Sequence, residues 1–244
     1  VETLKYGVLY NPDTRTWLKA VPPEALGTPQ YEVMEGRLRR SALQQQISLV
    51  ESGLPDLAQQ VRDVEVETDG QKVYGFTSPD IGPSLESFIY TLTGKRRSQD
   101  MPPEFVSFLS TIYSAASHQA ERLFLHYGIW MADPNPGNIL IRHDENGAHV
   151  VLIDFSNKHQ EADYLFSDLS RERYPGVNYV QKLKTSLLGQ VRGLHQRFAY
   201  YCGNLGIPFV RDSKAISSNI NESVAVVNAR KMLQATTTPP TDHE

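Results

Sequence analysis

The stretch GIWMADPNPGNILIRHDENGAHVVLIDFSN, residues 128–157, constrains the fold more than any other part of the chain. Its polar residues gather in a tight turn from Asp133 to Asn138 and at Asp154, after a second apolar run. Prolines and a glycine stiffen the turn, and the apolar runs 139–141 and 150–153 have the character of buried strands. A polar connection between the runs predicts a hairpin. This arrangement can bring one amide and two carboxylates into a small volume.

Three oxygen-bearing side chains in one small volume suit phosphoryl transfer, in which each has a distinct task. Asp133 would accept a proton from an attacking hydroxyl group or orient it. Asn138 and Asp154 would bind Mg²⁺, a hard cation that prefers oxygen ligands and stays tied to substrate phosphates. The flanking strands would hold these ligands on rigid elements, because positioning supplies much of this catalysis.

The rest of the chain is strand-rich at the start and helix-rich later. Alternating residues around the turns at 11–13 and 69–70 predict hairpins over 6–21 and 61–76. Apolar periodicity predicts helices over 31–52, 85–92, 103–127, 179–204 and 221–234. We therefore expect an α+β chain of two lobes: 1–80 as a small strand-rich lobe and 81–235 as a reduced helical lobe, followed by a disordered tail at 236–244.

Composition narrows the class of protein. A chain of 244 residues with 40% hydrophobic and 21% charged residues is ordinary for a globular protein. The net charge of -4 argues against nucleic acid as a partner. A single cysteine, Cys202, rules out an internal disulfide framework and suits a reducing, cytoplasmic compartment. No apolar stretch approaches the roughly 20 residues of a membrane-spanning helix.

The motif DPNPGNILI followed by LIDFS resembles the catalytic loop and metal-binding Asp-Phe-Gly segment of the protein-kinase-like superfamily. The ADPNPGNIL form is especially similar to the atypical kinases linked to coenzyme Q biosynthesis and to aminoglycoside-phosphotransferase-like kinases. The resemblance implies a two-lobed kinase-like fold, with ATP and Mg²⁺ as cofactors. It makes Asp133 the catalytic aspartate and Asn138 and Asp154 the metal ligands.

The same resemblance assigns roles in the first part of the chain. It implies that Lys19, in TWLKAV, binds the nucleotide phosphates, and that a helix glutamate pairs with it. Glu35 is the better candidate for this partner, and Glu32 is the reserve. The break at 78–82 matches the connection at which such kinases hold adenine through backbone groups, which places Ser78, Asp80 and Ile81 at the nucleotide.

Four departures from the kinase pattern stand out. No G-x-G-x-x-G precedes Lys19, so we expect either that the first strand was trimmed or that another backbone segment covers the nucleotide. Met131 and Ala132 stand where His and Arg are common, which predicts activity independent of activation-loop phosphorylation. Asn135 replaces a lysine that protein kinases often place there, and Ser156 replaces the glycine of Asp-Phe-Gly.

The sequence lacks an Ala-Pro-Glu motif after Asp154, which indicates a reduced carboxyl-terminal lobe. In this respect it resembles the minimal kinases that bacteria deliver into host cells. We therefore expect a cytoplasmic or host-delivered Mg-ATP-dependent kinase that phosphorylates a protein hydroxyl group. An activating protein partner is compatible with this expectation. Three alternatives stay open: an AMP transferase, a small-molecule kinase, or a nucleotide-binding pseudokinase that acts as an interaction module.

Overall fold

The computed structural model describes residues 5–68, 70–93, 101–155, 179–209 and 213–237. Ser156 and most of the expected tail at 236–244 lie outside these ranges. The chain has the expected α+β composition, with a four-stranded antiparallel sheet, a separate two-stranded hairpin and several helices. It divides into two compact units: Val1–Arg96 with Pro136–Asn157, and Arg97–Asn135 with Lys158–Glu244.

This division groups the residues differently from the lobes expected at 1–80 and 81–235, and it does not test the disordered tail expected at 236–244. The segment 136–157 belongs to the first unit because its hairpin packs against elements of that unit. The residues after 80 also stay with the first unit, as far as Arg96. A seam drawn from composition cannot anticipate a hairpin that returns from a distant part of the chain.

The sheet of the first unit consists of the two predicted hairpins joined side by side. The strands are β1 (Gly7–Asn11), β2 (Thr16–Ala20), β3 (Arg62–Thr68) and β4 (Gln71–Pro79), in the order β1-β2-β4-β3. Both hairpins are confirmed. β2 pairs antiparallel with β4, and Lys19 lies opposite Phe76. Because directly opposite residues share a face, this register determines which side chains surround Lys19.

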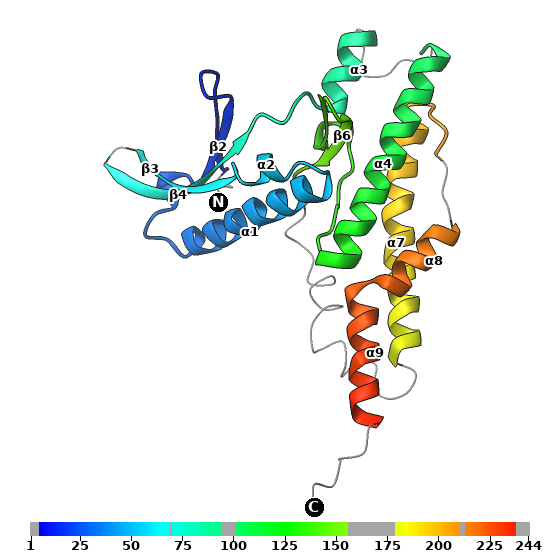
Figure 1. Ribbon diagram of the computed structural model, residues 1–244. Coiled ribbons are helices and arrows are strands. Elements are labelled where there is room, and N and C mark those ends of the chain that lie inside the picture. Colours follow the sequence, from blue (N-terminus) through cyan, green and yellow to red (C-terminus); the bar gives the residue numbers. More distant parts are fainter. Residues whose placement is uncertain (1–4, 69, 94–100, 156–178, 210–212, 238–244) are drawn as a thin grey trace, which may run out of the picture. The chain divides into compact units, whose positions relative to one another are not determined.

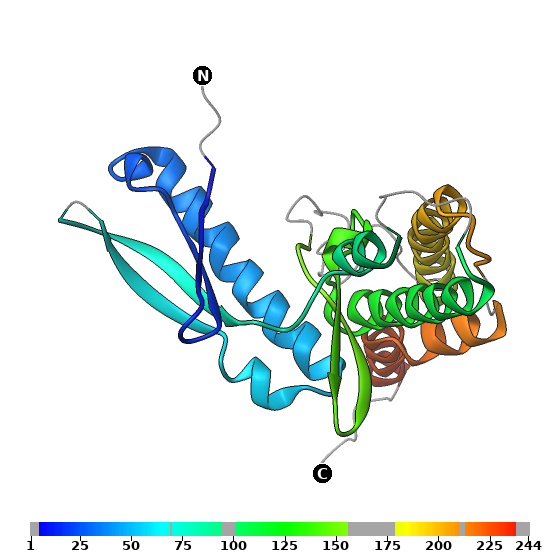
Figure 2. The same ribbon diagram turned by 90° about the horizontal axis from the view of Figure 1, so that it is seen from above.

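Helix α1 (Pro29–Glu51) runs alongside the sheet (Figures 1 and 2) and confirms the helix predicted over 31–52. Its buried side chains, among them Leu38 and Leu49, form one core with Tyr74 and Phe76 of β4. Gly53, at a φ of 78°, follows the helix in a left-handed conformation that favours glycine. The short elements η1 (Pro23–Ala25) and α2 (Pro55–Ala58) flank α1.

The hairpin predicted after the quoted turn is also confirmed, as β5 (Ile139–Asp144) and β6 (Gly147–Leu152), preceded by the short turn η2 (Pro136–Asn138). The end of α1 holds this hairpin: Ser48 donates a hydrogen bond from Oγ to the carbonyl oxygen of Leu152 (2.8 Å). His149 Nδ1 lies 2.8 Å from the carbonyl oxygen of Ser52. Helix α3 (Leu85–Thr93) contacts both β5 and η2.

The second unit is helical, with α4 (Pro103–Tyr127), α7 (Tyr179–Asn204), α8 (Ser213–Glu222) and α9 (Val224–Thr237). Helices α4 and α7 pack together, and α8 and α9 pack against both (Figure 1). The helices predicted over 103–127 and 179–204 are confirmed. The helix expected over 221–234 is also confirmed, as α9, but it begins at Val224 because the chain breaks at Ser223, whose Oγ accepts a hydrogen bond from the backbone of Val226. Helix α8, before this break, was not predicted.

A buried polar cluster ties three helices of the second unit together. Glu121 of α4 is 1% exposed, and its Oε2 lies 2.9 Å from Nε2 of His195 on α7. Its other oxygen, Oε1, accepts a hydrogen bond from Asn219 of α8 (2.8 Å). Buried carboxylates need such partners, so the cluster fixes how α4, α7 and α8 pack. Across the described ranges, no helix combines the length and apolarity needed to span a membrane.

Candidate functional site

The first unit contains a cavity of about 570 Å³ whose walls come from β1, β2, α1, β4, the segment after β4 and the β5–β6 hairpin. Apolar side chains such as Phe76, Leu140 and Ile153 line much of it. Polar groups enter it at a few points. The cavity is lined by six of the predicted site residues: Lys19, Ser78, Asp80, Ile81, Asn138 and Asp154.

The sheet register explains why Lys19 faces this cavity. Val8 and Phe76 lie directly opposite Lys19 on the two neighbouring strands, and all three line the cavity. Two residues earlier on β2, Trp17 faces the same side, because side chains alternate along a strand. The cavity therefore has an aromatic side chain and an ammonium group on one wall, about 7 Å apart along the strand.

The ammonium group of Lys19 lies over an aromatic ring. Its Nζ lies 5.4 Å from the centre of the Tyr6 ring, and no carboxylate of the described residues forms an ion pair with it. A partly buried cation that lacks a counter-ion is favourable only when an anion binds beside it or water reaches it. Lys19 is therefore a suitable residue for the phosphates of a ligand.

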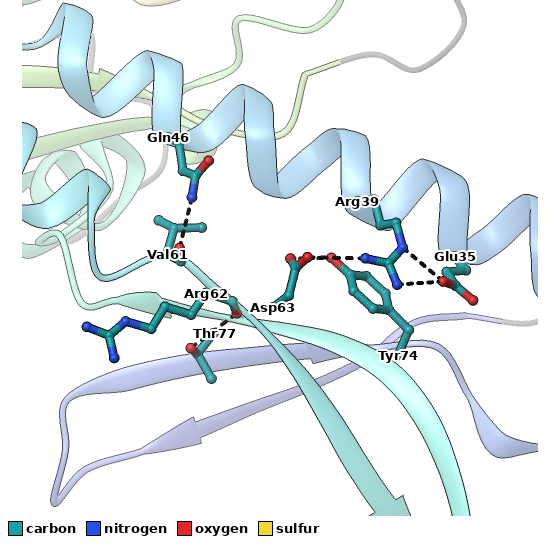
Figure 3. A network of polar contacts seen from close by, with 8 residues as sticks. All are labelled: Glu35, Arg39, Gln46, Val61, Arg62, Asp63, Tyr74 and Thr77. Atoms are coloured by element: carbon teal, nitrogen blue, oxygen red, sulfur yellow. Dashed lines mark hydrogen bonds and ion pairs between the residues drawn. The ribbon is translucent and has the colours of Figure 1, made fainter.

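Glu35, the expected partner of Lys19, is instead bound to Arg39. Figure 3 shows the Arg39 guanidinium between two carboxylates: its Nη2 lies 2.8 Å from Glu35 Oε1, and its Nη1 lies 3.1 Å from Asp63 Oδ2. The guanidinium also lies over the ring of Tyr74, at 4.0 Å from its centre. The expected Lys19–Glu35 pairing is thus replaced by a Glu35–Arg39 pair, and Glu35 does not line the cavity.

The helical period accounts for this difference. The residues of α1 that line the cavity are Ser41 and Gln45, which lie roughly two and three turns beyond Glu35. Gln45 donates a hydrogen bond from Nε2 to Ser78 Oγ (2.5 Å), so at the cavity α1 meets β4 through neutral groups. The reserve candidate, Glu32, is exposed in the first turn of α1. Helical spacing alone did not reveal which face of α1 meets the sheet.

The segment after β4 is fastened to β5 by backbone contacts. The backbone N–H of Ile141 donates to the carbonyl oxygen of Pro83 (3.0 Å), and Arg142 donates from Nη1 to that of Ile81 (3.4 Å). Gly82 has a φ of 146°, and a Cβ at this position would collide with the carbonyl oxygen of Ile141. Only glycine allows this close approach, which brings Ile81 to the cavity wall.

Asp80 is held at the outer edge of the cavity by the turn of the β1–β2 hairpin. Its Oδ2 lies 3.2 Å from Nη2 of Arg15 and accepts a hydrogen bond from Tyr10 (3.3 Å). The hydrogen bond from Arg15 raises the pKa of the guanidinium above its ordinary value, and the charge of Asp80 adds to this effect. Because the Asp80 carboxylate already has a cationic partner, its side chain serves to fix the segment.

Asn138 and Asp154 are neighbours across the open end of the β5–β6 hairpin. The register pairs Ile139 with Leu152, which places Asn138 beside Ile153, and the Ile153 N–H donates to the Asn138 carbonyl oxygen (3.1 Å). Asp154 follows directly, with a φ of 57°. A non-glycine residue in this region is uncommon, and such conformations often occur at functional sites. The hairpin therefore presents one amide and one carboxylate to the cavity.

Asp133 belongs to the second unit, where side chains of its own loop and of α7 hold its carboxylate. Tyr201 donates a hydrogen bond from Oη to Asp133 Oδ1 (2.5 Å), and Asn135 donates from Nδ2 to Oδ2 (2.8 Å). The bond to the Asp133 carboxylate is the main reason that the pKa of Tyr201 is raised to about 12. The loop backbone is also fixed, because Arg197 donates to the carbonyl oxygen of Ala132 (2.5 Å).

Sequence patterns did not reveal Trp17, Gln45, Arg197 or Tyr201 as residues near the candidate site. The one relevant signal was the spacing of Arg197 and Tyr201, which are four apart and so share a helix face. Among the described residues, no three His, Cys, Asp or Glu side chains form a ready-made metal cluster. A divalent ion at Asn138 and Asp154 would thus need further oxygen ligands from a substrate.

Comparison with known proteins adds no assignment. No family model matches the chain, and no curated protein sequence matches it.

Proposed function

We propose that the chain is a Mg-ATP-dependent phosphotransferase with a kinase-like arrangement, and that the cavity of the first unit binds the nucleotide. The observation that carries the proposal is the convergence of Lys19, Asn138 and Asp154 on one cavity. These residues offer a cation for phosphates and two hard oxygen ligands for Mg²⁺, which is the donor set that a metal–nucleotide complex needs.

The cavity suits a nucleotide in other respects as well. Its volume of about 570 Å³ lies in the range of small-molecule sites, and its walls are mainly apolar. Trp17 offers an aromatic face for a base, and Leu140 and Ile153 line the cavity as aliphatic side chains. The bound magnesium ion would supply charge neutralisation on the phosphates.

The residues of this chain would divide the work as follows. Lys19 holds the phosphates, and Asn138 and Asp154 hold the metal ion. Asp133 orients the acceptor hydroxyl group and takes its proton. In this reaction the acceptor oxygen forms a bond to the γ-phosphorus, the bond from that phosphorus to the β–γ bridging oxygen breaks, and ADP leaves. Glu35 is given no part, because Arg39 occupies its carboxylate.

Nucleotide binding is tested by thermal denaturation with Mg-ATP. We expect ATP with Mg²⁺ to raise the Tm of the parent, and Lys19→Met and Asp154→Asn to reduce the shift by at least half, because ligand stabilisation follows affinity. Lys72→Met is the matched control, since Lys72 is an exposed lysine of β4 that does not line the cavity. An equal Tm shift in the parent and the Lys19 and Asp154 variants would contradict the assigned site.

Group transfer is tested separately with labelled nucleotide. We expect label from γ-labelled ATP to reach a protein acceptor in the parent and to be lost in Asp133→Ala and Asp154→Ala. Transfer from α-labelled ATP would instead indicate an AMP transferase. Binding of ATP without transfer to proteins or small hydroxyl compounds would favour the interaction-module alternative.

A further inference from the structure

The second unit has a hollow of about 510 Å³ beside Asp133. The loop residues Asp133 and Pro134 form one side of it, and α7 contributes Gly193, Gln196 and Tyr200 to the other. The α7 residues are spaced three, four or seven apart, so they lie on one helix face. Gly193 leaves this face open, since a Cβ built there has no neighbour within 4 Å.

Helix α7, which forms one side of the hollow, is cationic as a whole. Over its 26 residues the helix carries lysine or arginine at four positions and no aspartate or glutamate, although the whole chain has a net charge of -4. The positions are Lys182, Lys184, Arg192 and Arg197. The excess of positive charge on one helix of an acidic protein indicates an anionic partner.

Two of these cations are available to a ligand. Lys182 and Arg192 are exposed, and neither forms an ion pair with the described residues. Lys182 lies 11 residues before Gly193, which is about three helical turns and returns it to the same face. Arg192 follows the helix about 100° around from Gly193, so it lies on the flank of this face. One exposed cation on the face and one on its flank thus accompany the hollow.

The remaining features fit an extended chain. Arg197 is fixed by its bond to Ala132 and lies 5.5 Å from the centre of the Trp130 ring, so its charge stays beside the Asp133 loop. Tyr200 is 65% exposed and offers an aromatic surface. Lys182 and Tyr200 are 18 residues apart, about 27 Å along the helix. This length corresponds to about eight residues of extended polypeptide.

We propose that this α7 face binds the acceptor, and that the acceptor is a polypeptide segment whose hydroxyl-bearing residue has acidic neighbours. The inference rests on the proposed function, since Asp133 is the group that would receive the hydroxyl group. A small molecule in the hollow would leave Lys182 out of reach. A polynucleotide would meet the negative field of the chain as a whole, whereas a short acidic peptide needs only the local cations.

Peptide binding tests the proposal without any catalytic step. The probes are two fluorescein-labelled nonapeptides with a central serine, one flanked by glutamates and one by lysines, and fluorescence anisotropy gives their Kd with the full chain at low salt. We expect the acidic peptide to bind at least tenfold more tightly than the basic one. Lys182→Glu/Arg192→Glu should then raise the Kd for the acidic peptide at least tenfold.

The control variant carries the same change in charge elsewhere. Lys72→Glu/Lys231→Glu alters exposed cations of β4 and α9, and we expect its Kd to stay within twofold of the parent. An equal loss of binding in both double variants would overturn the proposal, because only net charge would then matter. Equal affinity for the two peptides would also overturn it, as would tighter binding of a single-stranded oligonucleotide with the same charge as the acidic peptide.

A negative result in the peptide-binding assay can be distinguished from a failure of the proposed function. A chain that gains thermal stability from Mg-ATP but does not bind the acidic peptide retains the nucleotide site and loses the acceptor assignment. If the chain binds the peptide through α7 but Mg-ATP does not raise its Tm, the result contradicts the proposed phosphotransferase function. Where transfer is observed, Lys182→Glu/Arg192→Glu should raise the KM for an acidic acceptor and leave the KM for ATP unchanged.

Discussion

Tyr201→Phe tests whether α7 positions the proposed catalytic carboxylate. The substitution removes one hydroxyl group and keeps the ring, which packs edge-on against Tyr200 with centres 5.5 Å apart. It deletes the 2.5 Å hydrogen bond to Asp133 Oδ1 and leaves the bond from Asn135 to Oδ2. Asp133 therefore keeps its charge and its bond from Asn135, but it loses the contact by which α7 orients Oδ1.

The expected magnitude follows from the kind of bond lost. A hydrogen bond to a charged group contributes about 1.5–3 kcal/mol, and the exposure of Asp133 favours the lower end of that range. If most of that energy holds the carboxylate in its reactive position, kcat falls roughly tenfold, since 1.36 kcal/mol corresponds to a factor of ten in rate. The KM for ATP should not change, because Tyr201 does not line the nucleotide cavity.

The assay is steady-state transfer from γ-labelled ATP, with kcat and both KM values measured for the parent and for Tyr201→Phe. Tyr90→Phe is the control, because it removes a hydroxyl group from an exposed tyrosine of α3 in the first unit. Adding Asn135→Ala to Tyr201→Phe should lower kcat further. A Tyr201→Phe variant that folds normally and keeps kcat within twofold of the parent would refute the positioning role.

Three further predictions concern stability and can be checked without a substrate. Glu121→Ala should lower the free energy of unfolding by about 3–5 kcal/mol in urea titrations, since it leaves the buried His195 without its partner; a loss below 1 kcal/mol would contradict this account. Gly82→Ala should lower the Tm and abolish the Tm shift with Mg-ATP, because the added Cβ collides with the Ile141 carbonyl oxygen and the φ of residue 82 disfavours alanine. Unchanged ATP binding would contradict the claim that contact between this segment and β5 shapes the cavity. Burial raises the pKa of the Cys202 thiol from 9.0 to about 12, so its contribution to stability is present below pH 9 and is lost as the pH rises toward 12. The Tm measured by circular dichroism should thus fall more steeply above pH 9 in the parent than in Cys202→Ala, and parallel curves would contradict this.

Local sequence patterns predicted the helices and strands of this chain well where turn residues or helix-ending glycines mark their limits. The extents of α4 and α7 follow from apolar periodicity, and the left-handed Gly128 ends α4 as its position suggested. The turn residues predicted both hairpins of the sheet. The helix expected over 221–234 exists as α9, but its start at Val224 and the preceding helix α8 were missed, because apolar spacing does not detect a serine cap such as Ser223.

Part of the candidate site was accessible to the same reasoning. Asn138 and Asp154 flank the two strands of one hairpin, so their proximity follows from local pairing. The placement of Lys19 in the cavity depends instead on the pairing of β2 with β4, which are more than 50 residues apart. The preference of Glu35 for Arg39 depends on which face of α1 meets the sheet, and Tyr201 reaches Asp133 across 68 positions.

The order of residues along this chain was enough to predict most of its helices, its hairpins and the proximity of Asn138 to Asp154, because these depend on dihedral preferences and on neighbours within one hairpin or helix. Tertiary structure decided which side chains share the cavity, which carboxylate has a cation beside it and which helix holds the Asp133 loop. Such contacts join distant segments, and they form only where burial of apolar surface outweighs the entropy lost in closing the intervening chain.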